Sequence, residues 1–538
     1  MAGRGGLHRR VRRRLATRRH PRGRREPRHR GGAVGLPPFA RSPRVGHAPW
    51  PSHRTGGRRA RPGPDDRDRH ARRHELQRRR RAAIDPGHDT VRPAHGRGGG
   101  GRAMRKAASR FPTLSRHWPT LAVLGVLAAR YAGDSLRHRR EQGHGYSLRG
   151  EELDVRSPGF LHASESLTSA PISRGNELEL LVNGDEIFPA FLESIANAQR
   201  SVNLLTFVYW RGDIAEEVAA ALVERARAGV AVNVLLDAFG TAKMDSRLID
   251  DMRAAGVTVA RFRPLKRIPI GGLNNRTHRK VLVVDGSVGL IGGVGIAKEW
   301  TGNAQDPDHW RDTHVRVRGP IVRGIQGAFA DNWLEATGDV LVGPDYLPDL
   351  PAADGAGPMQ VVRSSAGVGD TNMEALYFLA IASARESIDL TAAYFAPRPA
   401  FVEALTQAAE RGVRIRVLVP GPHIDKDLVR QAGRAVYDRL LAAGVRIWEY
   451  APTMLHAKTM TIDGAWSTVG SANFDNRSFQ LNDEANLCVQ STAFAEDLTA
   501  QFERDLAVSR EIRPGRWRSR ALHQRVREQL LVRLRREL

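Results

Sequence analysis

Two stretches of the chain repeat one pattern of residue types that is suited to phosphate chemistry. The pattern is H-x-K-x4-D, and its two copies comprise His278, Lys280, Asp285, His456, Lys458 and Asp463. Each copy runs into an alternating stretch rich in Val, Ile and Thr, so the His and the Lys should share one face of a strand. A single copy would be a weak signal, because three fixed positions recur by chance. Two copies at identical spacing predict imidazole and ammonium groups that together bind a phosphate.

Small and polar residues follow each copy. The second copy continues into G-S-x-N, which contains Ser471 and Asn473, and the first continues into Gly292 and Gly293. These are turn compositions that can present backbone N–H, hydroxyl and amide donors where a strand ends. We therefore expect Gly293, Ser471 and Asn473 to bind the substrate phosphate.

The use of lysine at both motif positions is unusual for this chain. Only 7 of its 84 basic residues are Lys. The retention of Lys at both positions indicates a need for a compact ammonium in place of a planar guanidinium.

With these motifs, residues 176 to 515 resemble the phospholipase D superfamily and, within it, the bacterial cardiolipin synthases. Trp310, Arg311 and Asp312 in HWRDTHVRVRGP resemble a segment that follows the first motif of that family, and RSFQLNDE (477–484) resembles the one that follows the second. The resemblance implies a two-motif site at a pseudo-two-fold interface, with His278 as nucleophile, a phosphohistidine intermediate, His456 as general acid and neither metal nor other cofactor. The chain departs from the family at Gly295, where Asn is usual, and at Lys298, where an acidic residue is common.

The chemistry explains why two copies are needed. Cleaving a phosphodiester through a covalent intermediate takes a nucleophile on one side and a proton donor for the leaving oxygen on the other. The two lysines would stabilise charge on the non-bridging oxygens. The motif places Asp285 and Asp463 in the catalytic set, yet on a strand they point away from the Lys. Orienting a His across the interface, closing a buried polar network or forming a D-G turn are their possible roles. No metal-ligand spacing stands out, and His309, Asp312 and His314 are interpreted as structural.

The rest of the chain predicts an α/β fold of two similar phospholipase D-like domains, each a mixed β-sheet flanked by helices, related by pseudo-two-fold symmetry. Strands are expected at 201–210, 230–240, 387–395 and 413–421, and helices that end at a glycine at 214–229, 246–256, 400–412 and 434–444. A longer loop precedes the first motif, and its Lys266, Arg267 and Arg276 either form a lip over a phosphate or are solvated loop charges.

Charge divides the chain into segments. The first 100 residues hold 29 Arg against 7 acidic residues, whereas the residues after position 150 carry four more acidic than basic side chains. We expect residues 1–103 to be a disordered Arg-rich segment, either a basic arm or an over-extended reading frame that truly starts at Met104. Residues 104–175 form a basic segment with a short apolar stretch and a linker, 176–345 and 357–512 the two domains, and 513–538 a basic amphipathic helix.

Membrane contact is predicted at two places. Residues 118–132 are too short to span a bilayer and could be an interfacial anchor, a signal-like segment or a packed helix. The C-terminal helix, with Leu522, Val526, Leu530 and Leu534 on one face, either lies on an anionic membrane surface or docks on the second domain. The single cysteine, Cys488, fits a cytosolic compartment. We therefore expect a monomer at the cytoplasmic face of the cell membrane, with both half-sites in one chain.

Three reaction classes fit the motifs. The resemblance favours a phosphatidyltransferase that joins two phosphatidylglycerol molecules into cardiolipin. A phospholipase D-type phosphodiesterase would use the same residues with water as acceptor. A nuclease is less favoured and no nucleic-acid partner is expected, because the body of the protein lacks the clustered basic residues that track a phosphate backbone.

Overall fold

The computed structural model describes residues 146–150, 152–264, 275–352, 355–365 and 370–521, together with 524, 526 and 528. The expectations for residues 1–103, for 118–132, for Lys266 and Arg267 and for most of the C-terminal helix lie outside these residues. Gln524, Val526 and Glu528 are helical, and the carboxylate of Glu528 pairs with Arg434 and Arg520. None of the helices within the described residues is both long and apolar enough to cross a lipid bilayer.

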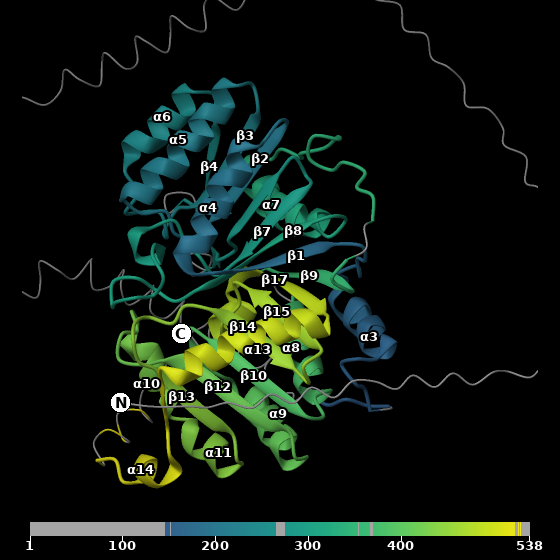
Figure 1. Ribbon diagram of the computed structural model, residues 1–538, viewed down its shortest axis with the longest axis vertical. Coiled ribbons are helices and arrows are strands. Elements are labelled where there is room, and N and C mark those ends of the chain that lie inside the picture. The colour runs from purple at the N-terminus through teal and green to yellow at the C-terminus, as the bar shows by residue number, and fades with distance from the viewer. Residues whose placement is uncertain are drawn as a thin grey trace, which may run out of the picture. The chain divides into compact units, whose positions relative to one another are not determined.

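The first half of the described chain builds a seven-stranded mixed sheet (Figure 1). Its strands are β1 (Glu177–Val182), β2 (Ser201–Thr206), β3 (Ala231–Asp237), β4 (Thr258–Phe262), β6 (Val281–Val284), β7 (Val288–Gly292) and β8 (Thr313–Arg318). Its helices are α4 (Asn183–Ala196), α5 (Asp213–Arg227), α6 (Ser246–Ala254) and α7 (Val322–Thr337), with a 3-10 turn at Lys298–Trp300. The order across the sheet is β1-β8-β7-β6-β2-β3-β4, in which β2, β3 and β4 are parallel and the other pairs are antiparallel.

The second half repeats this sheet. Its strands are β9 (Met359–Ser364), β10 (Ser387–Ala392), β12 (Arg414–Pro420), β13 (Arg446–Tyr450), β14 (Lys458–Ile462), β15 (Trp466–Gly470), β17 (Asn482–Gln490) and β18 (Ser509–Glu511). Its helices are α8 (Asn372–Ala382), α9 (Pro399–Glu410), α10 (Asp427–Arg434), α11 (Tyr437–Ala442), α12 (Asn476–Gln480), α13 (Thr492–Ala507) and α14 (Pro514–Arg518). The order β9-β17-β15-β14-β10-β12-β13 matches the first sheet strand for strand, and the predicted α/β fold of two similar sheets is confirmed.

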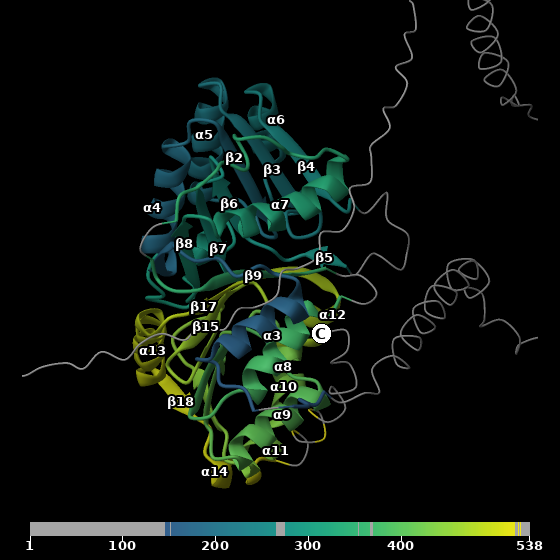
Figure 2. The ribbon, with the colours of Figure 1, turned by 90° about the vertical axis from the view of Figure 1, so that its right-hand side faces the viewer.

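Shorter elements complete the fold. β5 (Arg276–Thr277) belongs to the first half in sequence but pairs with β17 of the second sheet. β11 (Phe395–Ala396) pairs with β16 (Phe474–Asp475). The helix α3 (Pro158–Thr168) packs against α8 (Figure 2).

Alternation along the strands divides the core into layers. On β2 and β6, Leu204 and Leu282 face α4, α5 and α6, whereas Leu205 and Val281 face α7. The α7 layer also contains Leu487 of β17, so one apolar cluster joins the two sheets. The chain therefore buries both faces of its sheets, as near-continuous apolar strands require.

Local sequence signals account for the element ends. The four glycines expected to end helices, Gly229, Gly256, Gly412 and Gly444, all adopt the left-handed conformation, with φ between 91° and 97°. The helix predicted at 434–444 differs, because the structure has α10 before it and starts α11 only at Tyr437. A Cβ at Gly433 would lie 2.0 Å from the carbonyl oxygen of Phe395, so α10 approaches β11 closely at this glycine. Two turn residues, 435 and 436, separate α10 from α11.

The motif strands are the first arms of two tight hairpins. In the β6–β7 hairpin, Asp285 and Gly286 have φ of 52° and 63°, and the N–H of Ser287 donates to the Val284 carbonyl at 2.9 Å. In the β14–β15 hairpin, Asp463 and Gly464 have φ of 52° and 57°. Positive φ at both central residues is the turn that Asp-Gly favours. The spacing from Lys to Asp is thus the length of one short strand.

Candidate active site

Backbone hydrogen bonds between the halves place the two motifs beside each other. The N–H of His278 donates to the carbonyl of Asp483 at 2.9 Å, just beyond the pairing of β5 with β17. Likewise, the N–H of His456 donates to the carbonyl of Arg311 at 2.7 Å, and Arg311 donates to that of Met454 at 2.9 Å. Each motif histidine is therefore anchored to the segment that follows the motif of the opposite half.

The two histidines and two lysines form one buried group. Their exposed fractions are 7% for His278, 2% for Lys280, 5% for His456 and 1% for Lys458. The charge of Lys458 acts on the pKa of His278, and that of Lys280 acts on the pKa of His456. The structure thus brings together the four motif residues that the sequence singled out.

Asp312 of the first half holds the imidazole of the second. The Nδ1 of His456 lies 2.7 Å from Asp312 Oδ2, which also accepts a hydrogen bond from the indole Nε1–H of Trp300 at 2.8 Å. Burial raises the pKa of Asp312, but His456 and Lys458 outweigh burial and hold this pKa below its usual range. An ionised Asp312 fixes the Nδ1–H tautomer of His456 and leaves its Nε2 to exchange protons.

Glu484 of the second half holds the imidazole of His278 in the first half. The Nδ1 of His278 lies 3.1 Å from both carboxylate oxygens of Glu484 and 3.1 Å from the carbonyl oxygen of Ser471. Acceptors on this side require an Nδ1–H, so the Nε2 of His278 carries the free lone pair. Burial lowers the pKa of His278 well below its ordinary value, and the positive charges of both motif lysines lower it further. The imidazole is therefore neutral and able to act as a nucleophile.

The lysines lie against the backbone of their own histidines. The ammonium of Lys280 donates to the carbonyl of His278 at 2.7 Å. That of Lys458 donates to the carbonyl of His456 and lies 3.0 Å from the Nδ1 and 3.1 Å from the Nε2 of this imidazole. With Nδ1–H directed at Asp312, Nε2 is the ring nitrogen that can accept from Lys458 in the free protein. Burial lowers the pKa of Lys458 to about 8, although Asp312 and Glu484 counteract this shift. Burial and the charge of Lys458 also lower the pKa of Lys280. A bound phosphate would offset this repulsion.

The motif aspartates do not reach the imidazoles. The carboxylate of Asp285 accepts backbone N–H groups from Gln199, Arg200 and Ser201 at 2.7 to 3.2 Å. Asp463 accepts those of Arg385, Glu386 and Ser387 at 2.8 to 2.9 Å. The prediction that these aspartates orient a histidine across the interface is wrong, because their side chains face away, at the turn, and Asp312 and Glu484 orient the histidines. The expected D-G turn is confirmed for both aspartates. Asp463 is also buried among its backbone donors, whereas Asp285 is partly exposed and does not close a buried network.

The glycines of the first copy make room for other site residues. A Cβ at Gly293 would lie 2.1 Å from Asp312 Oδ1, and one at Gly295 would lie 2.7 Å from the Cβ of Val208 and 3.3 Å from the ring of Trp300. Gly293 therefore admits the carboxylate that holds His456. Gly295, where the family resemblance led us to expect Asn, leaves space for the indole that hydrogen-bonds Asp312.

Ser471 and Asn473 differ in how far their polar atoms are already hydrogen-bonded. The hydroxyl of Ser471 donates to Glu484 at 2.5 Å and accepts from the N–H of Ala485 at 3.0 Å, so it supports the carboxylate before any phosphate arrives. Asn473 is buried, and within the described residues its Oδ1 has no hydrogen-bond partner. As a phosphate-binding residue, Asn473 remains a prediction.

Arg276 does not form a lip. It lies in β5 with 2% of its surface exposed, donates to the carbonyl of Arg263 at 2.9 Å and lies 3.7 Å from Asp237. Both interpretations of Arg276, as a phosphate lip and as a solvated charge, are therefore wrong.

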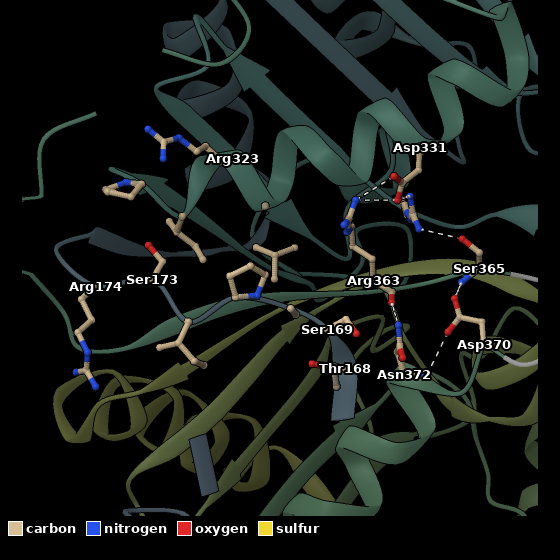
Figure 3. A pocket seen from close by; sticks show the side chains of 18 residues that line it. Thr168, Ser169, Ser173, Arg174, Arg323, Asp331, Arg363, Ser365, Asp370 and Asn372 are labelled. Atoms are coloured by element: carbon tan, nitrogen blue, oxygen red, sulfur yellow. Dashed lines mark hydrogen bonds and ion pairs between the residues drawn. The ribbon is translucent and has the colours of Figure 1, made fainter. Parts of the chain in front are cut away.

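Arg279, which separates His278 from Lys280, points to the opposite side of the motif. It reaches the wall of a cavity of about 680 Å³ that lies between α7, β9 and the start of α8 (Figure 3). Figure 3 shows Arg363 and Asp331 paired on this wall, where their atoms approach to 2.9 Å. Neither motif histidine nor motif lysine lines the cavity, so it is separate from the site of chemistry.

Sequence reasoning missed the role of two carboxylates. It interpreted Asp312 as structural, and it noted Glu484 only as part of a family-like segment. His309 and His314 do stay outside the reactive group, since His309 bonds Asp306 at 2.7 Å and the ring of His314 packs on Phe191. A signal was present: each carboxylate stands in the segment that follows a motif, at equivalent positions on the two sheets.

Comparison with known proteins identifies the family of the chain. The family described as "Cardiolipin synthase, PLD-like domain" matches residues 191–307 and 377–506. A cardiolipin synthase of Geobacillus sp. (strain WCH70) is 36% identical over 373 residues, which are 68% of this chain and 73% of the relative. Cardiolipin synthase 2 of Bacillus anthracis is 36% identical over 68% of this chain and 71% of the relative.

A solved structure shares the fold. The phosphatidylserine synthase of Haemophilus influenzae Rd KW20 superimposes with a TM-score of 0.53 at 13% identity, over 70% of this chain and all of that one. Two similar sheets with one motif each define the phospholipase D class of fold. Within that class, the chain belongs to the cardiolipin synthase family of phospholipase D-like proteins.

Proposed function

We propose that the protein is a phosphatidyltransferase that makes cardiolipin and glycerol from two molecules of phosphatidylglycerol. The observation that carries the proposal is the buried pair of imidazoles, each with its Nδ1 held by a carboxylate of the other half. This arrangement leaves two Nε2 atoms for one phosphodiester. It is supported by the relatives, which are cardiolipin synthases.

In the first half-reaction, His278 Nε2 attacks the phosphorus of the donor lipid. An N–P bond forms, the P–O bond to the glycerol headgroup breaks, and His456 gives its proton to the leaving glycerol oxygen. Burial and Lys458 lower the pKa of His456 to about 3 in the free protein. The negative charge of the bound phosphate offsets that of Lys458 and raises this pKa, so that His456 can carry the proton.

In the second half-reaction, a hydroxyl of the acceptor headgroup gives its proton to His456 and attacks phosphorus. The N–P bond breaks, and His278 returns to its neutral form. Lys280 and Lys458 stabilise the charge on the non-bridging oxygens in both steps, while Asn473 supplies an amide donor. The roles of His278 as nucleophile and His456 as acid follow the family resemblance alone, because burial lowers the pKa of both imidazoles in the free protein.

A phospholipase D-type hydrolase is the second candidate, since water could replace the lipid acceptor. Two tryptophans beside the imidazole of His456 help to decide between transferase and hydrolase. The rings of Trp300 and Trp310 lie 5.2 and 5.6 Å from that of His456. Apolar walls limit water around the general base and favour a lipid hydroxyl as acceptor.

The test incubates purified protein with phosphatidylglycerol vesicles in EDTA and resolves the products. Cardiolipin with equimolar glycerol is the expected result. Phosphatidic acid as the main product would identify a hydrolase, and strict dependence on added Mg²⁺ or Ca²⁺ would show that the lysines do not supply the charge stabilisation. Trapping the phosphorylated peptide identifies the nucleophile, with phosphate on His456 as the outcome against our assignment.

The remaining proposals concern the setting of the reaction. The lipid substrate requires access to a membrane, and we propose that the protein works as a monomer at the cytoplasmic face of an anionic bilayer, without a nucleic-acid partner. Both half-sites come from one chain, so no second copy is needed to complete the site.

A further inference from the structure

Lysine is rare in this chain, and the described lysines are unevenly placed. Among the described residues they are Lys243, Lys280, Lys298, Lys426 and Lys458. Two are the buried motif lysines, and the other three are exposed. Only one exposed lysine, Lys426, is among the charges that shift the pKa values of both motif lysines.

Lys426 sits on an aromatic support that leads to the reactive group. Its ammonium lies 4.8 Å from the ring centroid of Tyr394, and that ring lies 6.4 Å from the imidazole of His456. The hydroxyl of Tyr394 is fixed in turn by the carboxylate of Asp425 at 2.8 Å. Because the ring of Tyr394 is buried and its hydroxyl is hydrogen-bonded, its cation–π contact holds the ammonium of Lys426 at the second half of the site.

The ammonium of Lys426 is available to a ligand. Its side chain is exposed, and within the described part of the chain it has no hydrogen-bond or ion-pair partner. The nearby carboxylate of Asp425 is engaged by Tyr394. The positive charge of Lys426 also lowers the pKa of His278, so it acts across the interface on both halves.

The proposed reaction creates a need for such a charge. Once the donor phosphate is bound to His278, its charge is met by Lys280 and Lys458, and the acceptor lipid must bring a second phosphodiester close to the first. The two negatively charged phosphates repel each other at short range, and a cation beside the second phosphate would offset this repulsion. A neutral acceptor such as glycerol brings no such charge.

We propose that Lys426, seated on Tyr394, binds the phosphodiester of the acceptor lipid. This inference rests on the proposed transferase function and names the subsite that function requires. Lys426 is thus a specificity-determining residue: it favours an anionic lipid over a small neutral alcohol as acceptor. It does not contact the reacting phosphorus.

The experiment compares two acceptors with one donor. Phosphatidylglycerol in neutral detergent micelles is the donor in both arms. One arm measures cardiolipin formation, and the other measures exchange of labelled glycerol into phosphatidylglycerol, which uses the same intermediate with a neutral acceptor. The variants are Lys426→Gln and the control Lys243→Gln, which removes an exposed lysine that lies 4.1 Å from the ring of Trp210 in the first half.

We expect Lys426→Gln to lower cardiolipin formation about tenfold or more, as loss of a charge-assisted contact does, and to change glycerol exchange less than about threefold. The loss should appear as a higher KM for phosphatidylglycerol in cardiolipin formation but not in glycerol exchange, and Lys426→Arg should restore part of it. Lys243→Gln should leave both arms near wild type.

Three outcomes would overturn the inference. An equal fall in both arms would place Lys426 in the chemistry of the first phosphate. Equal losses in the Lys426→Gln and Lys243→Gln proteins would indicate general attraction to an anionic lipid surface. No change in either arm would show that Lys426 binds no acceptor. If the wild-type protein gives neither cardiolipin nor glycerol exchange, the proposed transferase function itself fails, which is a separate result.

Discussion

At the scale of single residues, the carboxylate of Asp312 receives three hydrogen bonds. They come from the Nδ1 of His456 at 2.7 Å, from the indole of Trp300 at 2.8 Å and from the backbone N–H of Thr313 at 2.8 Å. Asparagine keeps the shape of the side chain but loses the negative charge, and its NH2 group cannot accept a hydrogen bond. We expect Asp312→Asn to lower phosphatidyl transfer by about a hundredfold or more, because the imidazole loses its tautomer and its orientation.

Asp306→Asn is the matched control. Asp306 lies 2.7 Å from the Nδ1 of His309 on the partly exposed surface, and it holds neither motif histidine. Transfer should stay near wild type in this variant. Near-normal transfer by the Asp312→Asn protein would refute the role given to the carboxylate, provided that thermal unfolding shows both variants to be folded.

Lys280 tests the need for a compact ammonium. It is 2% exposed and donates to the carbonyl of its own histidine at 2.7 Å. Arginine keeps the charge but needs space for a planar fork, so Lys280→Arg should cost about a hundredfold in kcat. The exposed Lys298 accepts the same change, and Lys298→Arg should cost far less. A Lys280→Arg enzyme as fast as wild type would mean that charge alone suffices.

The pKa shifts predict a bell-shaped pH dependence of kcat/KM. Burial lowers the pKa of Lys280 to about 7 and that of Lys458 to about 8, so the ammonium groups are lost as pH rises through this range and the rate should fall on the alkaline side. Burial raises the pKa of Glu484, so its carboxylate is lost as pH falls and the acid side should decline as well. Initial rates in neutral micelles test both limbs, and a flat profile from pH 6 to 10 would contradict the assignment.

At the scale of elements, the motif aspartates tie each hairpin to the strand beside it. Asp463 is 4% exposed and accepts three backbone N–H groups at the start of β10. Asp463→Asn should lower the free energy of unfolding by about 2 kcal/mol, because charged acceptors make the stronger hydrogen bonds. Transfer per folded molecule should change little. Denaturant unfolding and activity measured on one preparation separate the two effects, and a large loss of activity at unchanged stability would return Asp463 to the catalytic set.

The same elements show how far the sequence could predict the structure. The glycines that end helices and the Asp-Gly turns act over a few residues, so local patterns found them. The partners of the histidines are set by tertiary folding: His456 and Asp312 are 144 residues apart, and His278 and Glu484 are 206 residues apart. No period or spacing reports such a contact. The turn between α10 and α11 was also missed, and it follows directly after Gly433, whose close approach to β11 is a tertiary contact.

At the scale of the whole molecule, Arg279 joins both halves behind the reactive group. Its fully buried guanidinium donates to the carbonyl of Ala328 in α7 at 2.7 Å, to that of Ser364 in β9 at 2.9 Å and to that of Glu484 in β17 at 3.2 Å. One side chain therefore fixes the register between the first motif, the helix behind it and the carboxylate that holds His278.

Removing this guanidinium should affect both stability and activity. Arg279→Met fills similar space but leaves three buried carbonyls without their donor, so we expect a loss of about 3 kcal/mol or more in the free energy of unfolding. Because Glu484 is then less firmly placed, transfer by the folded protein should also fall. Arg363→Met is the control. Arg363 pairs with the carboxylate of Asp331 from the exposed side, and this carboxylate also lies 3.3 Å from Arg279, so the control should cost under about 1 kcal/mol. Equal and small losses in both variants would show that the register between the halves is set by the apolar layer around α7 and does not depend on Arg279.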